Sequence, residues 1–445
     1  MPAHRRPFRS MLAATLLTFS ACATSEPPPK DPPPTPNAQD ICRLNGTCAG
    51  STCPTAITGA VSAVPAEACP RYFEDQGGAD IFAWNSFLAL NWPADLSTCS
   101  ANASASIGAP GPRVWETYAL DSNVFVSSGR PQAWCSDALR ASLSGPRSFG
   151  GIAKAPHSQI EKLHGIDESV GGVLTDQNGR FVRYEVRINQ DEHNYLLTNN
   201  LWNKAGQASA KQAGTPINFP QGPGDSPSRC GAHPCGPVGA MEVKAAWKVL
   251  SDSEKASGRF YTTQGIVYND ENGSPSPGRN PVTLGLVGLH ILHKTEKLKT
   301  WWWATFEHVD NTTTSFFNKD CRDCPANKQL AKQPYTELSP NGERLNPSTQ
   351  VVRATPIETT DLNSPALNKY YQGLLRNAGS VFQNYELVSI QWATGAALNG
   401  EPAPLASTVL ETYFQKNSSC MGCHKFAQTT AGQPGDFSFL LQQAH

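Results

Sequence analysis

From residue 170 onward the pattern of apolar and polar side chains favours strands, and in 180–188 it alternates strictly with a two-residue period. In residues 180–188 this pattern places four apolar or aromatic residues on one side of an extended chain, namely Val182, Tyr184, Val186 and Ile188. Four further segments have the composition of strands: 241–247, 259–268, 284–293 and 301–309. Strands at such short spacing predict a mainly antiparallel, barrel-like or open sheet.

The segment 284–293 is nearly all apolar, as expected of a central strand. A charged stretch, Lys294–Lys299, separates it from 301–309, and this short connection predicts a hairpin. Side chains alternate along a strand, so His290 and His293 are expected on opposite faces of the sheet.

Helical spacing marks three segments. Residues 80–90 carry an aromatic and aliphatic face that packs in the core, and Pro93 ends that helix. Ser364-Pro365 is typical of a helix start and Gly379 of a helix end. Thr408 and Glu411 fit a capping box, which predicts a helix running on to residue 420. Its buried side is expected to hold Val409, Leu410, Tyr413 and Phe414. The polar, Gly- and Pro-rich stretches 204–239 and 318–350 are predicted to be loops.

These patterns predict an α+β fold, with a mainly antiparallel β body and a C-terminal helical segment. The chain starts with basic residues and a short apolar run, 11–19, which together predict an export signal. A Pro-rich stretch follows and cannot form a core. The expected organisation is signal peptide 1–21, tether 22–41, disulfide-containing β-rich body 42–355 and helical segment 356–445.

The stretch Cys420-Met421-Gly422-Cys423-His424 holds the most specific chemistry in the sequence. In a C-x-x-C-H motif, two thiols and an imidazole meet on one turn of chain, so they can hold a porphyrin and its iron together. The alternatives are a redox C-x-x-C pair or half of a zinc site.

The segment 404–445 resembles the c-type cytochromes through Cys420, Cys423 and His424. The resemblance implies one covalent haem c, with thioethers to both cysteines and His424 as an axial iron ligand. In that family the second axial ligand is commonly a Met well after the motif, but no Met follows Met421. A distal residue is therefore expected from the body, and the candidates are Met241, His290, His293 and His308. Each of them can equally be an ordinary buried Met or a hydrogen-bonded sheet histidine.

Phe19-Ser20-Ala21-Cys22 resembles a bacterial lipobox. The resemblance implies cleavage before Cys22 and lipidation of its thiol, and Ala23 resembles the residue found in lipoproteins sorted to the outer membrane. Ordinary secretion is the alternative. The expected location is the periplasmic side of the bacterial envelope, with contact to the membrane through the anchor alone.

Ten cysteines remain besides Cys22, Cys420 and Cys423, an even number in an oxidising compartment, so up to five disulfides are expected. Cys230–Cys235 and Cys321–Cys324 would close short loops, and a disulfide is favoured over a second haem or a zinc pair for the latter. The chain has 36 basic and 37 acidic residues and no charge run, which argues against nucleic-acid binding.

Three functions agree with this sequence. The first is an exported mono-haem cytochrome that transfers electrons to or from a redox partner protein. The second is a haem c oxidoreductase, peroxidase- or oxygenase-like, acting on a small molecule. The third is a haem-based binding or sensor protein. An open iron position would favour the last two, with His290, Glu307 and His308 as the expected pocket.

Overall fold

A computed structural model describes residues 38–45, 52–68, 76–149, 173–222, 236, 238–271, 274–277, 280–298, 300–328, 347–357, 364–394, 400–416 and 419–445. The predicted signal peptide, Cys22, most of the tether and the pair Cys230–Cys235 lie outside these residues. Of the helices in the described ranges, not one has both the length and the apolar composition that crossing a bilayer requires.

Strands and helices are interspersed along the described chain, with β7 to β10 following one another directly. The strands are β1 (Ala94–Asp95), β2 (Ser100–Ala101), β3 (Ala119–Leu120), β4 (Arg147–Phe149), β5 (Arg183–Ile188), β6 (Met241–Val249), β7 (Thr262–Glu271), β8 (Ser274–Pro277), β9 (Val282–Lys294), β10 (Trp301–His308) and β11 (Tyr385–Gln391). The α-helices are α1 (Ala38–Asn45), α2 (Gln76–Leu90), α3 (Asp121–Val124), α4 (Asp137–Leu143), α6 (Gln190–Thr198), α7 (Lys204–Gln212), α9 (Asp252–Ser257), α10 (Ser364–Asn377) and α11 (Cys420–His424). Short 3-10 helices cover Gly59–Val61, Val114–Thr117, Val381–Asn384 and Phe439–Gln443, and a π-helical turn covers Asn311–Ser315.

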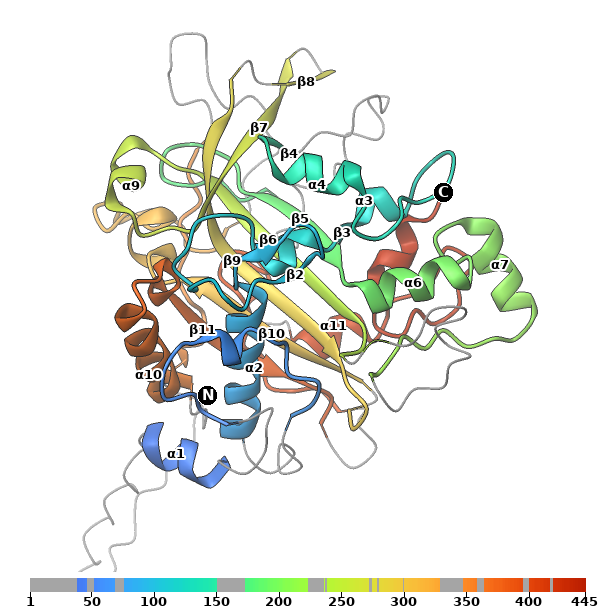
Figure 1. Ribbon diagram of the computed structural model, residues 1–445. Coiled ribbons are helices and arrows are strands. Elements are labelled where there is room, and N and C mark those ends of the chain that lie inside the picture. Colours follow the sequence, from blue (N-terminus) through green and yellow to red (C-terminus); the bar gives the residue numbers. More distant parts are fainter. Residues whose placement is uncertain are drawn as a thin grey trace, which may run out of the picture. The chain divides into compact units, whose positions relative to one another are not determined.

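The main sheet has the strand order β11-β10-β9-β6-β5-β3, and each of these neighbours is antiparallel (Figure 1). Strand β7 pairs with the start of β9, and β4 lies parallel to β7. The predicted hairpin is confirmed, with Trp301 opposite Lys294 and Thr305 opposite His290. The predicted mainly antiparallel α+β class is confirmed as well.

Helices α2 and α10 cover one face of the sheet (Figure 1). Trp84 of α2 stacks on Tyr371 of α10 at a ring distance of 4.9 Å and meets Phe306 of β10 edge-on at 5.0 Å. The predicted core role of this helix is confirmed, but α2 is buried almost all round and not on one face only. Such a helix lies between layers, so its polar Asp80 and Ser86 are also enclosed.

The C-terminal segment covers the opposite face. Val409 and Leu410 pack on Ala246 and Val287, while Met421, Leu440 and Leu441 pack with Trp301 and Trp303. The segment 356–445 was expected to be helical, yet it also supplies β11, which forms an edge of the sheet.

The predicted helix from Thr408 is wrong, because residues 408–416 form turns and a bend. Ser407 takes the capping position: its hydroxyl accepts from the Val409 and Leu410 amides, and Glu411 accepts from the Ser407 amide at 2.7 Å. Thr408 instead bonds to Glu307 of β10 through its hydroxyl at 2.7 Å. These tertiary bonds hold the segment against the sheet. Val409 and Leu410 are buried as expected, but Phe414 is 45% exposed.

The predicted loop 204–239 is also partly wrong, because it contains helix α7. The Asn203 side chain caps this helix by accepting from the Gly206 amide at 2.8 Å. Gln207 then donates to the Leu441 carbonyl at 2.8 Å, so the helix is fixed against the carboxyl end of the chain. Because Gln207 and Leu441 are far apart in the sequence, the residues around Gln207 alone could not predict this contact.

Three disulfides are described: Cys42–Cys53, Cys99–Cys135 and Cys321–Cys324. The last confirms the prediction of a disulfide-closed turn in place of a second haem or zinc motif.

Candidate functional site

The C-x-x-C-H motif forms the short helix α11, which is capped locally and bonded to strand β11. The Ser419 hydroxyl caps it by accepting from the Gly422 amide at 3.1 Å. The Cys420 amide donates to Oε1 of Gln391 in β11 at 3.0 Å. Met421, one of the two residues between the cysteines, is buried and packs in the core. The motif is therefore held in a fixed position at the sheet, with Cys423 on the outside.

Both motif cysteines are free thiols, whereas the other six described cysteines form the three disulfides. Burial raises the pKa of Cys420 and Cys423, and the nearby Glu411 carboxylate raises both further. The thiols are consequently protonated at neutral pH. This is the species whose S–H bond adds across a vinyl group to form a thioether, with no change in net oxidation state.

His424 is prepared to bind a metal through one defined nitrogen. Its Nδ1 lies 2.8 Å from the Phe437 carbonyl, which can only accept, so Nδ1 carries the proton. Nε2 then keeps its lone pair, and within the described residues it has no hydrogen-bond partner. Burial lowers the pKa of His424 to about 4, so the imidazole is neutral at neutral pH. A backbone carbonyl at the second nitrogen is the usual way to orient a metal-ligating histidine.

Aromatic rings surround this imidazole. Trp303 of β10 lies 5.2 Å from the His424 ring and Phe439 lies 5.1 Å from it. Phe414 and Phe426, at 45% and 65% exposure, are the exposed large hydrophobic residues of the described chain, and both flank the motif. Apolar rings at the imidazole, together with exposed aromatic side chains before and after the motif in the sequence, suit the apolar faces of a porphyrin.

Three ionisable side chains lie near the motif: His290 and Lys244 on the sheet, and Glu411 on the turn segment before the motif. Glu411 and Lys244 influence the pKa of Cys423, and His290 influences that of His424. His290 is held at both nitrogens, by the Thr305 hydroxyl at 3.0 Å and by the Glu411 carboxylate. The two partners hold the His290 ring in one orientation. Burial favours the neutral form of Glu411, but His290 and Lys244 more than offset this and lower its pKa.

The four expected distal residues separate between the two faces of the sheet. Only His290 shares a face with Trp303 and the motif. Met241 and His293 lie opposite each other on β6 and β9, on the face covered by α2. His293 stacks on Phe82 and bonds to the Val238 carbonyl at 2.7 Å.

His308 follows Phe306 by two residues on β10 and so lies on the α2 face, where it meets Tyr385 edge-on at 5.1 Å. It stacks on Phe260 at 4.0 Å and bonds to the Arg259 carbonyl at 3.1 Å. The expected pocket of His290, Glu307 and His308 is therefore not assembled, because the sheet separates His308 from the other two.

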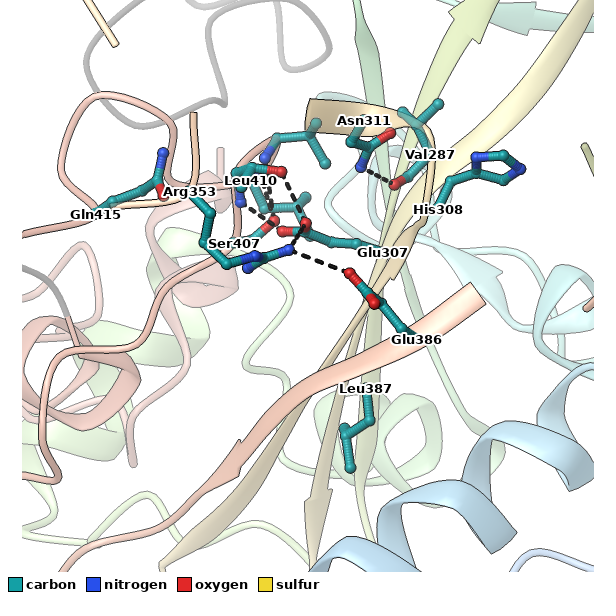
Figure 2. A network of polar contacts seen from close by, with 12 residues as sticks. Val287, Glu307, His308, Asn311, Arg353, Glu386, Leu387, Ser407, Leu410 and Gln415 are labelled. Atoms are coloured by element: carbon teal, nitrogen blue, oxygen red, sulfur yellow. Dashed lines mark hydrogen bonds and ion pairs between the residues drawn. The ribbon is translucent and has the colours of Figure 1, made fainter. Parts of the chain in front are cut away.

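Glu307 holds the turn segment before the motif in place. Its carboxylate accepts from the backbone amide and hydroxyl of Thr408 and pairs with Nη2 of Arg353 at 2.5 Å. Arg353 also approaches Glu386 of β11 at 3.5 Å, so that it lies between the two acids (Figure 2). Glu307 is thus a structural residue of the site and is not available as an acid–base group.

Sequence reasoning missed Lys244, Glu411 and the Phe437 carbonyl. Lys244 is one polar position in a strand, and the capping-box pattern accounted for Glu411. A carbonyl leaves no trace in the residue type. The pairing of β6 with β9 sets Lys244 directly opposite His290, and only this pairing could have identified Lys244 as a residue of the site.

Among the described residues, no group of three or more His, Cys, Asp or Glu side chains is arranged to hold a metal ion by itself. Comparison with protein-family models, with curated proteins and with solved structures finds no match to this chain.

Proposed function

We propose that this chain is an exported mono-haem c-type cytochrome that transfers electrons. Cys420 and Cys423 would hold the haem through thioethers and His424 would bind its iron through Nε2. The observation that carries the proposal is the bond from Nδ1 of His424 to the Phe437 carbonyl, which leaves Nε2 as a neutral donor. A redox C-x-x-C pair gains nothing from a histidine oriented in this way.

Bound at these residues, haem c supplies an iron that gains and loses one electron. The chain supplies the rest. Phe437 fixes the tautomer and direction of the ligand imidazole. Trp303 and Phe439 cover part of the imidazole, which lowers the local dielectric constant and would tune the potential. The exposed apolar side chains of Phe414 and Phe426, before and after the motif in the sequence, are available to a redox partner protein.

A second candidate function, a haem c oxidoreductase acting on a small molecule, is supported by the His290–Glu411 pair. A histidine held by a carboxylate is the usual arrangement of an acid–base group, and Lys244 adds a positive charge beside it. Such a group would donate or accept a proton while a small ligand is oxidised or reduced.

The proposal includes the cell location expected from the start of the chain. Export would bring the cysteines to an oxidising compartment, and the anchor at Cys22 would keep the body at the periplasmic side of the outer membrane. The partner is a redox protein or a small molecule, with no role for nucleic acid.

The test is to produce the exported protein in a bacterial host competent in cytochrome maturation and to measure its intact mass and absorption spectrum. We expect the mass of one haem added to the mature chain, and none in a variant with Cys420→Ser and Cys423→Ser. A wild-type protein without the macrocycle would contradict the proposal. Carbon monoxide separates the two functions: an unchanged low-spin spectrum supports electron transfer, and a shifted high-spin spectrum supports the oxidoreductase.

A further inference from the structure

Two glutamates are buried together behind the residues that hold His424. Glu192 of α6 is 0% exposed and Glu242 of β6 is 5% exposed. Both carboxylate oxygens of Glu192 and Oε1 of Glu242 lack a donor group among the described residues. The two carboxyls instead interact with each other. Two buried acids that face one another in this way must share at least one proton, because two bare carboxylates would repel at short range.

The positive charge around the pair is too small to neutralise the two carboxylates. Lys294 of β9 is the cation that faces it, and its ammonium is already bound to Asp436 and to Asn218. The Ser438 hydroxyl bonds to Glu242, and Asp436 adds a further negative charge. Among the described residues that influence the pair most, three carboxyls face one ammonium, so this group is neutral only when Glu192 and Glu242 are both protonated.

The pair lies next to the support of the proposed iron ligand. Asp436 and Ser438, which face the pair, flank Phe437, and the Phe437 carbonyl accepts the proton of His424 Nδ1. Trp301, on the same strand as the aromatic neighbour of His424, donates to the Asp436 carbonyl at 2.8 Å. One short stretch of backbone thus contacts both the acid pair and the imidazole.

Burial and mutual repulsion raise the pKa of both carboxyls, so that the pair titrates in the pH range around neutrality. Burial is the main cause that raises the pKa of Glu242 to about 7, and it raises that of Glu192 well above its usual range, with the charge of Glu242 adding to the effect. One proton of the pair is therefore exchanged near neutral pH, where a small change in local charge alters its occupancy.

We propose that the Glu192–Glu242 pair is a proton-binding site linked to the oxidation state of the haem at His424. The inference rests on the proposed function. When a redox partner delivers one electron to the iron, the pair takes up one proton from solvent. When the electron leaves, the proton returns to solvent. The added electron makes the local charge more negative, and this charge strengthens proton binding by a buried group in a medium of low dielectric constant.

The test measures the reduction potential of the haem-loaded protein between pH 5.5 and pH 9, with redox mediators and optical detection. In the window where the pair titrates, we expect the potential to fall by about 59 mV per pH unit, since a tenfold change in proton activity corresponds to about 59 mV for one electron. The slope should vanish in Glu242→Gln and Glu192→Gln. It should persist in Asp252→Asn, which removes an exposed acid on α9.

A wild-type potential that does not depend on pH, or an equal slope in the Gln variants, would overturn the linkage. Infrared spectroscopy of the pair supplies a second readout that needs no haem. The carbonyl stretch of a protonated buried carboxyl should be present at pH 6 in the haem-free protein and absent in the double Gln variant. If the band is missing in wild type, the pair holds no proton and the inference fails. A protein with this band but without haem would instead defeat the proposed function, and the linkage with it.

Discussion

Replacing Glu307 by Gln tests how the turn segment before the motif is held on the sheet. The substitution keeps the shape of the side chain and removes its charge. Glu307 accepts three bonds, two from Thr408 and one from Arg353, and is fully buried. Gln retains one acceptor oxygen, but its NH2 group then faces a donor. Breaking a buried pair costs roughly 3–5 kcal/mol, and because Arg353 keeps Glu386 at 3.5 Å we expect a loss of about 3 kcal/mol.

The assay is urea unfolding followed by tryptophan fluorescence, because several tryptophans lie in the same core. Glu386→Gln is the matched control: it contacts the same arginine at the more exposed end of the network, so its cost should stay below about 1 kcal/mol. Arg353→Met should cost as much as Glu307→Gln, and the double variant should lose less than the sum of the two. Equal unfolding of the Glu307→Gln and Glu386→Gln proteins would refute this reasoning.

Three further predictions address the site and the core. In His424→Ala, the thioethers should still retain the haem mass while the iron loses its protein ligand, so the spectrum should change; an unaltered spectrum would show that another residue binds the iron. Trp84→Ala should lower the free energy of unfolding by about 3–5 kcal/mol, because it removes a buried ring stacked on Tyr371, and a loss under about 1 kcal/mol in urea would contradict the packing. Burial lowers the pKa of His293 to about 4 from 6.5, so the unfolded chain binds a proton that the folded protein does not. Stability should therefore be complete above pH 6.5 and fall by about 3 kcal/mol toward pH 4. His293→Gln should flatten this part of the profile, and an unchanged profile would argue against a buried neutral imidazole.

The sequence by itself determined the local elements and the identity of the motif. Alternating side chains located β5, strand-like composition located β6, a nearly all-apolar run located β9, and the charged turn located the hairpin to β10, because these are local properties. The motif was found from five consecutive residues for the same reason. The helical spacing of apolar residues in 80–90 likewise identified a helix. It could not show that the opposite side of that helix is buried as well.

Only the tertiary structure decided which groups meet. Strand alternation placed His290 and His293 on opposite faces, but the side on which residues 420–445 return depends on contacts such as Gln391 with Cys420. Glu411 was taken for a helix cap because its nearest sequence neighbours fit that pattern, whereas its side chain bonds to His290, 121 residues away. The burial of Glu192 against Glu242 likewise depends on a contact between residues far apart in the sequence. Free energies of contact between distant residues depend on the packing of the whole chain, and no window of neighbouring residues contains them.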